Sequence, residues 1–237
     1  MLKGTSWAHT RERNKPISLR FEQGAVRGFL HRPVHEPSAG LVLTHGAGGN
    51  CESPLLVAVA DAFCRAGIAV LRLNLPFRER KRFGPPLPAA AKESRAALRE
   101  GAAALRKVTT HRIFLGGHSY GGRQASMLAA EDAEVADALL LLSYPLHPPG
   151  KADELRTDHF PELRTPVFFV HGTKDPFGSI EEMSSAVRLI AAEATLVALE
   201  GAGHDLARGK FDIERLVVMP FMKLFTQSPL RRVEAEE

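Results

Sequence analysis

Ser119 stands at the centre of the pentapeptide GHSYG, residues 117–121, whose spacing can present a hydroxyl nucleophile. An apolar run over 112–116 precedes the motif, and a helix-like run over 123–131 follows it. A serine at the apex of such a strand–turn–helix connection is forced out of the sheet, with its hydroxyl at the mouth of a site. The flanking glycines give the strained turn the room that it needs. The alternative interpretation is a glycine-rich turn with an ordinary helix-capping serine.

A serine hydroxyl is a poor nucleophile at neutral pH, so the chemistry requires a base and a carboxylate that orients the base. Asp175 follows the apolar run 166–171, and His204 follows the apolar run 195–199. Strand ends of a parallel sheet share one edge, so both side chains are predicted beside Ser119. Taken singly, Asp175 could form an Asx-turn and His204 could be an ordinary loop histidine. Their joint occurrence predicts a catalytic triad of Ser119, His204 and Asp175.

Acyl transfer also needs two donors for the negative charge that develops on the carbonyl oxygen. The main-chain N–H group of Tyr120, directly after the serine, is the first candidate. The second is predicted in the loop HGAGGN, residues 45–50, with Ala47 as first choice and Gly48 as next. The small residues of this loop let the main chain approach a substrate closely. A phosphate-binding nest is the alternative, and it is disfavoured because the loop has neither a P-loop ending nor a G-x-G-x-x-G spacing.

The elements that must position these groups follow from the hydrophobic pattern. From residue 40 onward, short runs that are apolar throughout alternate with helix-like segments, which is typical of strands covered on both faces. We therefore predict an α/β fold, doubly wound around a mostly parallel sheet. Two runs on either side of Gly24-Ala25 predict an N-terminal antiparallel hairpin. Helices are predicted over 54–65, 88–107, 123–131, 179–192 and 211–225. The last helix is expected to bend near Pro220.

The length of 237 residues suits one domain of this kind. We predict that it spans residues 16–226, between a flexible N-terminal arm over 1–15 and a solvated C-terminal tail over 227–237. Cys51 and Cys64 are the two cysteines of the sequence, and their spacing indicates neither a disulfide framework nor a metal site. The sequence leaves the oligomeric state open.

Composition narrows the class of partner. Hydrophobic residues make up 44% of the sequence and charged residues 24%, which is ordinary for a soluble globular protein. The formal net charge is only +4, and no nucleic-acid-binding motif is present, so no nucleic-acid partner is expected. No run approaches the length of a transmembrane helix, and the first residues lack the apolar core of a secretory signal. The sequence therefore predicts a cytoplasmic protein without a membrane partner.

Together these motifs resemble the α/β-hydrolase superfamily over residues 17–225, and the chain order Ser, Asp, His is the order found there. The elbow with its trailing Gly122-Arg123, the loop HGAGGN and the segment HGTKDPFG are similar to a small bacterial subfamily described as dienelactone-hydrolase-like. This resemblance implies a serine hydrolase that cleaves a carboxylic ester or thioester with no metal or organic cofactor. Dienelactone is not implied as the substrate, because true dienelactone hydrolases carry a cysteine where Ser119 stands.

The resemblance also bears on access to the site. Many members of the superfamily carry a helical cap between the strand after the elbow and the strand that bears the acid. The corresponding interval, residues 144–165, is short here, which implies an open site with little or no cap domain. Because a fold does not fix an activity, the alternative function is a catalytically silent, hydrolase-like binding module.

A basic loop is predicted over residues 77–83, after the apolar run 68–73 and on the same edge of the sheet. Arg78 and Arg80 could bind a carboxylate or a phosphate of the substrate through the fork of a guanidinium group. The alternative is an ordinary solvated charged loop. The predicted partner is a small-molecule ester substrate, with an anionic ester as the option that these arginines raise.

Overall fold

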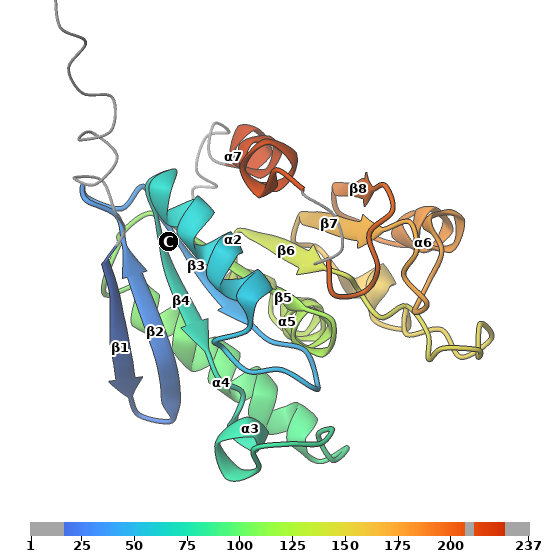
Figure 1. Ribbon diagram of the computed structural model, residues 1–237, viewed down its shortest axis with the longest axis horizontal. Coiled ribbons are helices and arrows are strands. Elements are labelled where there is room, and N and C mark those ends of the chain that lie inside the picture. Colours follow the sequence, from blue (N-terminus) through green and yellow to red (C-terminus); the bar gives the residue numbers. More distant parts are fainter. Residues whose placement is uncertain (1–16, 207–210, 226–237) are drawn as a thin grey trace, which may run out of the picture.

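Runs rich in leucine, valine and phenylalanine form the centre of one eight-stranded sheet in the computed structural model of the chain (Figure 1). The structure describes residues 17–206 and 211–225, so the predicted arm over 1–15 and the predicted tail over 227–237 lie outside the described residues. The strands are β1 Ile17–Gln23, β2 Val26–Arg32, β3 Ala39–Thr44, β4 Ile68–Leu73, β5 Arg112–His118, β6 Ala138–Leu142, β7 Val167–Gly172 and β8 Ala194–Leu199.

The strands lie side by side in the order β1-β2-β4-β3-β5-β6-β7-β8. β2 pairs antiparallel with both β1 and β4, whereas all the pairs from β4 to β8 are parallel. Every residue of β3, β4, β6 and β7 is buried, as expected for parallel strands that are covered on both faces. The predicted fold class is therefore confirmed: a doubly wound, mostly parallel α/β sheet with an N-terminal antiparallel hairpin.

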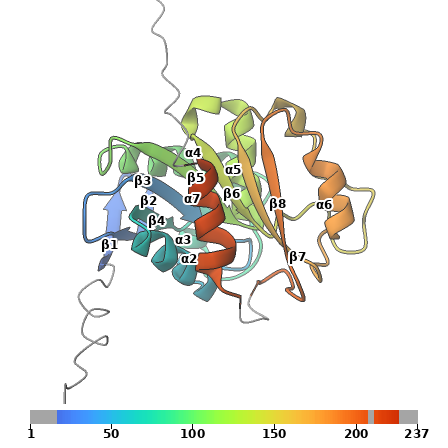
Figure 2. The ribbon, with the colours of Figure 1, turned by 90° about the horizontal axis from the view of Figure 1, so that it is seen from above.

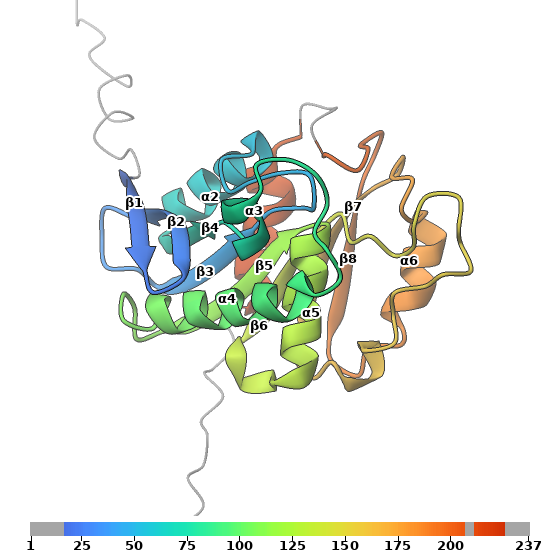
Figure 3. The same cartoon turned by 90° about the horizontal axis from the view of Figure 1, so that it is seen from below.

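Helices cover both faces of this sheet (Figures 2 and 3). α2 and α7 pack on one face, and the apolar residues of α4, α5 and α6 join the hydrophobic core on the other. α2 buries Leu56, Val59, Ala60 and Phe63, a spacing that places them on one side of a helix. The helices are α2 Pro54–Arg65, α3 Pro76–Arg80, α4 Ala90–Leu105, α5 Tyr120–Glu131, α6 Ile180–Val187 and α7 Met219–Phe225. None of the helices in the described part of the chain has the length and apolarity of a membrane span.

Several segments differ from the sequence prediction. The helix predicted over 179–192 is shorter, because α6 ends at Val187. The predicted basic loop over 77–83 begins as the short helix α3, because Pro76 sits in its first turn, where a fixed φ is favourable and a missing N–H costs nothing. The predicted bend near Pro220 is a π-helical segment, Glu214–Val218, which runs directly into α7. Proline has no N–H to donate to the preceding turn, so a regular α-helix is interrupted there.

The carboxyl ends of the parallel strands meet at one edge. β3 leads into the glycine loop 45–50, β5 leads into Ser119, and the segments after β7 and β8 carry Asp175 and His204. The connection from β6 to β7 contains only a 3-10 turn at Phe160–Glu162. No helical cap therefore stands between these strands, as the short interval implied.

Candidate active site

Ser119 occupies the turn between β5 and α5 with φ 52° and ψ −118°, a conformation that residues with a side chain rarely adopt. Hydrogen bonds fix the turn on both sides. The N–H of Ser119 donates to the carbonyl of Leu142 on β6 (2.8 Å), and the N–H of Arg123 donates to the carbonyl of Ser119 (3.0 Å). Such strain persists only where the surroundings enforce it, and it gathers at functional sites. The Ser119 side chain makes no capping hydrogen bond, so the ordinary-cap alternative has no support.

The glycines of the motif are required by space. A Cβ atom on Gly117 would lie 2.7 Å from the main-chain nitrogen of Gly122. A Cβ atom on Gly121 would lie 2.6 Å from the carbonyl oxygen of His45, at the start of the glycine loop. Both distances are far below van der Waals contact. Any larger residue would therefore push the elbow away from its own strand or from the glycine loop.

The structure brings Ser119, His204 and Asp175 together, although 85 and 29 residues separate the pairs in sequence. Nε2 of His204 lies 2.8 Å from Oγ of Ser119. Nδ1 of the same ring lies 2.8 Å and 3.0 Å from the two carboxylate oxygens of Asp175. The Asp175 side chain is fully buried, whereas that of His204 is 21% exposed. This geometry lets the imidazole accept the serine proton on one nitrogen while the carboxylate holds the other.

The Asx-turn considered for Asp175 is present as well. Oδ1 of Asp175 accepts the N–H of Phe177, two residues on, at 2.9 Å. The carboxylate therefore shapes its own loop and faces His204 at the same time. His171 is buried beside it, with Nε2 donating to the carbonyl of Gly178 (2.8 Å), and burial lowers the pKa of this histidine. A neutral His171 leaves the carboxylate charge directed at His204.

Two further side chains hold the His204 loop, and the sequence analysis missed both. Nε2 of His118 donates to the carbonyl oxygen of His204 at 2.7 Å, which ties the loop to the end of β5. Burial lowers the pKa of His118, which favours the neutral ring. The ring of Phe177 packs on the His204 imidazole, with centroids 4.2 Å apart. The position of His118, next to the nucleophile in the motif, was the one signal in the sequence that could have marked it.

The glycine loop lies against the elbow. A Cβ atom on Gly46 would lie 3.2 Å from Cβ of Ser119, so the main chain of the loop passes close to the nucleophile. His45 anchors the loop from within the core: Nε2 accepts the N–H of Leu75 (3.1 Å), and Nδ1 donates to the carbonyl of Gly46 (2.8 Å). This pattern requires a neutral ring, and burial lowers the pKa of His45 to about 4.

The predicted oxyanion donors come from the glycine loop and from the elbow, the two segments that approach each other here. Ala47 and Gly48 line the same cavity as Ser119. Tyr120 is the first residue of α5, directly after the nucleophile. Main-chain N–H groups at a helix start carry partial positive charge and suit a developing anion. A Cβ atom on Gly48 would meet nothing within 4 Å, so packing alone does not require a glycine there.

Arg78 and Arg80, the predicted substrate-binding residues, lie outside the cavity beside Ser119. Arg78 is 7% exposed, and its guanidinium donates to the carbonyl oxygens of Ala47, Lys81, Arg82 and Gly84. Arg80 is exposed and pairs with Glu93 on α4. Neither arginine lines the cavity beside Ser119. The predicted arginine fork for an anionic substrate therefore finds no support in the geometry.

The cavity beside Ser119 has a volume of about 530 Å³. The glycine loop from Gly46 to Gly49 lines it together with His118, Ser119 and His204. Its remaining walls are largely apolar, with contributions from Pro54, Leu55, Leu56 and Phe177. We call this the Ser119 cavity.

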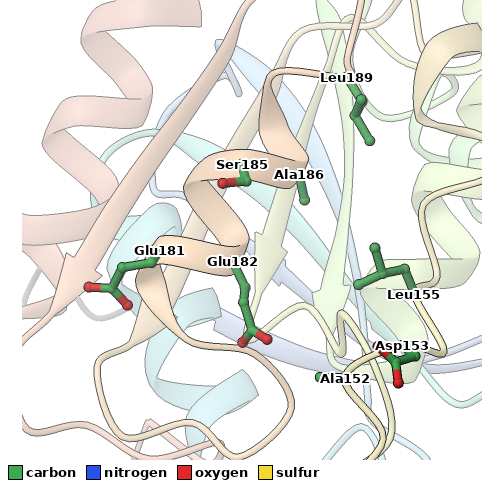
Figure 4. Close-up of a pocket in the computed structure, with 8 residues that line it drawn as sticks. All are labelled: Ala152, Asp153, Leu155, Glu181, Glu182, Ser185, Ala186 and Leu189. Atoms are coloured by element: carbon green, nitrogen blue, oxygen red, sulfur yellow. The ribbon is translucent and has the colours of Figure 1, made fainter.

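A second cavity of about 530 Å³ lies between α6 and the loop 152–155 (Figure 4). Carboxylates and leucines dominate its lining, so we call it the acidic cavity. Its residues are Ala152, Asp153, Leu155, Glu181, Glu182, Ser185, Ala186 and Leu189. Within residues 17–206 and 211–225, no three His, Cys, Asp or Glu side chains gather in a way that could hold a metal ion.

A family model described as "Alpha/beta hydrolase domain" matches residues 37–215, which is more than half of the chain. This region contains the glycine loop, the elbow, Asp175 and His204.

Solved structures share the fold at low sequence identity. Dienelactone hydrolase from Anabaena variabilis is 20% identical, with a TM-score of 0.69 over 92% of this chain and 100% of that one. Est1E from Butyrivibrio proteoclasticus, in a structure with ferulic acid bound, is 19% identical, with a TM-score of 0.71 over 89% and 100%. XC6422 from Xanthomonas campestris, described as an α/β serine hydrolase without a lid, is 18% identical, with a TM-score of 0.69 over 91% and 97%.

Proposed function

The chain belongs to the alpha/beta hydrolase domain family, and from this premise we propose that it is a serine hydrolase that cleaves a carboxylic ester or thioester through an acyl-enzyme on Ser119. The observation that carries the proposal is the hydrogen-bonded series from Asp175 through His204 to a strained serine. The presence of all three groups also argues against a catalytically silent binding module.

In the acylation half, Oγ of Ser119 attacks the substrate carbonyl carbon while its proton passes to Nε2 of His204. Asp175 holds the Nδ1–H and stabilises the imidazolium that forms. The N–H groups of Tyr120 and of Ala47 or Gly48 receive the negative charge on the carbonyl oxygen. The bond to the leaving alcohol or thiol then breaks, and His204 donates its proton to that group.

In the deacylation half, water takes the place of the alcohol or thiol. Its oxygen bonds to the acyl carbon while one proton passes to Nε2 of His204. The bond from the acyl carbon to Oγ of Ser119 then breaks, and the proton returns from His204 to the serine. A carboxylic acid leaves, and the enzyme is restored without any metal or organic cofactor in the reaction.

The Ser119 cavity supports a neutral ester with an apolar acyl or alcohol group. Pro54, Leu55, Leu56 and Phe177 provide apolar surface, and no arginine or lysine among the described residues lines it. Apolar groups gain free energy when such walls remove them from water, at roughly 25 cal/mol per Å². The basic loop gives no reason to prefer an anionic ester, because Arg78 donates to the Ala47 carbonyl and Arg80 pairs with Glu93.

The proposal is tested with short chromogenic esters and a fluorophosphonate probe. The wild-type protein should turn over the ester and carry the probe on residue 119. Ser119→Ala should lose labelling and about 10⁴- to 10⁶-fold of kcat. A folded wild-type protein that neither reacts with the probe nor cleaves any ester of the panel would instead support the binding module.

A further inference from the structure

Arg78 is a buried cation whose bonds all run to the main chain. A buried guanidinium is costly unless its donors are satisfied, and in Arg78 the two Nη atoms have partners in the described part of the chain whereas Nε has none. Nη1 donates to the carbonyls of Lys81 (3.1 Å) and Arg82 (2.7 Å), within its own loop. Nη2 donates to the carbonyls of Gly84 (3.0 Å) and Ala47 (2.5 Å). The bond to Ala47 crosses 31 residues of sequence and joins this loop to the glycine loop beside Ser119.

Holding a carbonyl also directs the N–H of the next residue. A peptide unit is planar and trans, so its C=O and N–H bonds point in opposite directions. Arg78 lies outside the Ser119 cavity, whereas Ala47 and Gly48 line it. The Ala47 carbonyl is therefore drawn away from the cavity, and the N–H of Gly48, on the same peptide unit, is turned towards it.

The preceding peptide unit is fixed in the same way. The carbonyl of Gly46 accepts hydrogen bonds from Nδ1 of His45 (2.8 Å) and from the N–H of Gly49 (3.1 Å). Its partner N–H belongs to Ala47. The carbonyls of Gly46 and Ala47 are thus both held by hydrogen bonds. The N–H groups on the same two peptide units, those of Ala47 and Gly48, therefore have a fixed orientation.

The far end of the loop has a second arginine. Nη1 of Arg72, on β4, donates to the carbonyl of Cys51, and Oδ1 of Asn74 accepts the N–H of Cys51 (2.7 Å). Together with Leu75, which donates to His45, the segment 72–78 supplies the partners that hold the glycine loop. Among these, Arg78 acts nearest to the predicted oxyanion donors.

We propose that Arg78 is a positioning residue: it holds the glycine loop in the shape in which the N–H groups of Ala47 and Gly48 face the oxyanion. This rests on the proposed function, because an oxyanion forms only if Ser119 attacks a carbonyl. The guanidinium acts through the Ala47 peptide and does not touch the substrate.

The test compares Arg78→Lys and Arg78→Met with Arg80→Lys and Arg80→Met, the matched control on the same short helix. Lysine keeps the charge, but its single ammonium cannot span four carbonyls. For the Arg78 variants kcat should fall about 10- to 100-fold with KM within about twofold, since a displacement near 1 Å costs up to 10²-fold. The loss should be equal for a neutral and an anionic ester of the same acyl length. The Arg80 variants should match the wild type.

Other outcomes decide against the proposal. A rise in KM confined to the anionic ester would make Arg78 a substrate-binding residue. An unchanged kcat in a folded Arg78→Lys protein would also overturn it. Thermal melting of each variant separates misfolding from mispositioning.

A second measurement is independent of turnover. Amide hydrogen exchange in the peptide that covers 45–50 should speed up in Arg78→Lys and not in Arg80→Lys. Equal exchange in the two variants would reject the positioning role even if the wild-type protein cleaved no ester. Failure of the proposed function would appear separately, as a wild-type protein that neither labels nor turns over.

Discussion

The Ser119 cavity and the acidic cavity have the same volume, about 530 Å³, yet they are built in different ways. The first is lined by residues from the segments after β3, β7 and β8, from the end of β5 and from the start of α2. The second is bounded by α6 and one loop. Ligands of parallel α/β sheets bind beyond the carboxyl ends of the strands. The side chains that line the two cavities, and not their size, therefore distinguish them.

Two carboxylates, Asp175 behind His204 of the Ser119 cavity and Glu182 of the acidic cavity, are also used differently. Asp175 has a fully buried side chain and accepts hydrogen bonds from His204 and Phe177. Glu182 is partly exposed and accepts the main-chain N–H of Ser179 (2.7 Å), which closes a capping box at the start of α6. One carboxylate orients a base next to a nucleophile, and the other stabilises the end of its own helix. The partners of a carboxylate thus say more about its role than its presence in a cavity.

The largest effect that separates the two carboxylates should come from Asp175→Asn. Asparagine keeps the size of the side chain and can still accept the Phe177 N–H, but it carries no negative charge to stabilise the imidazolium. We expect kcat to fall by about 10⁴-fold, with the melting temperature nearly unchanged. Steady-state kinetics with a chromogenic ester, alongside a thermal melt, measures both. A loss below tenfold would remove Asp175 from the proposed mechanism.

Acid should weaken the protein at the glycine loop of the Ser119 cavity. Burial lowers the pKa of His45 from 6.5 to about 4, so the unfolded chain binds this proton more readily than the folded one. The stability that the folded protein draws from a neutral His45 is therefore complete above pH 6.5 and is lost as the pH falls towards 4. The difference between these pKa values corresponds to roughly 3 kcal/mol of unfolding free energy.

His45→Gln isolates this contribution. Glutamine can still accept the Leu75 N–H, but it does not titrate. Urea unfolding at pH 7 and at pH 4.5 should show a shallower loss of stability in the variant than in the wild type. His159, whose pKa burial also lowers to about 4, is present in both proteins and cancels in the comparison. Equal pH dependence in the two proteins would show that His45 is not the titrating group.

Sequence alone predicts the strands and helices and the proposed triad, because each of these depends on a local pattern. Apolar runs such as 138–142 mark buried strands, and Ser119, Asp175 and His204 each come within five residues of the end of such a run. The supporting contacts are different. The bond from Arg78 to the Ala47 carbonyl and the bond from His118 to the His204 carbonyl join a side chain to a distant main chain. Every residue has a carbonyl, so no residue type marks the partner.

The same reasoning explains why Arg78 was predicted to bind substrate. Four basic residues in a loop at the active edge have the composition of an anion site. Burial and the direction of the guanidinium decide between that role and a structural one, and neither can be read from composition. Pro76, by contrast, did carry a local signal for α3, since proline is favoured in the first turn of a helix.

The smallest effect should come from the acidic cavity, through Glu182→Gln. A capping box accepts glutamine in this position, so the bond from Ser179 can persist. The hydrogen bond from the Ser179 N–H, together with His147, lowers the pKa of Glu182, so its charge stabilises the helix start at neutral pH and ceases to do so as acid protonates it. Loss of that charge should cost at most about 1 kcal/mol of unfolding free energy at pH 7. Because no described residue that lines the Ser119 cavity bonds directly to Glu182, kcat and KM should stay within about twofold of wild type. A tenfold loss of kcat in a folded Glu182→Gln protein would mean that the two cavities are coupled.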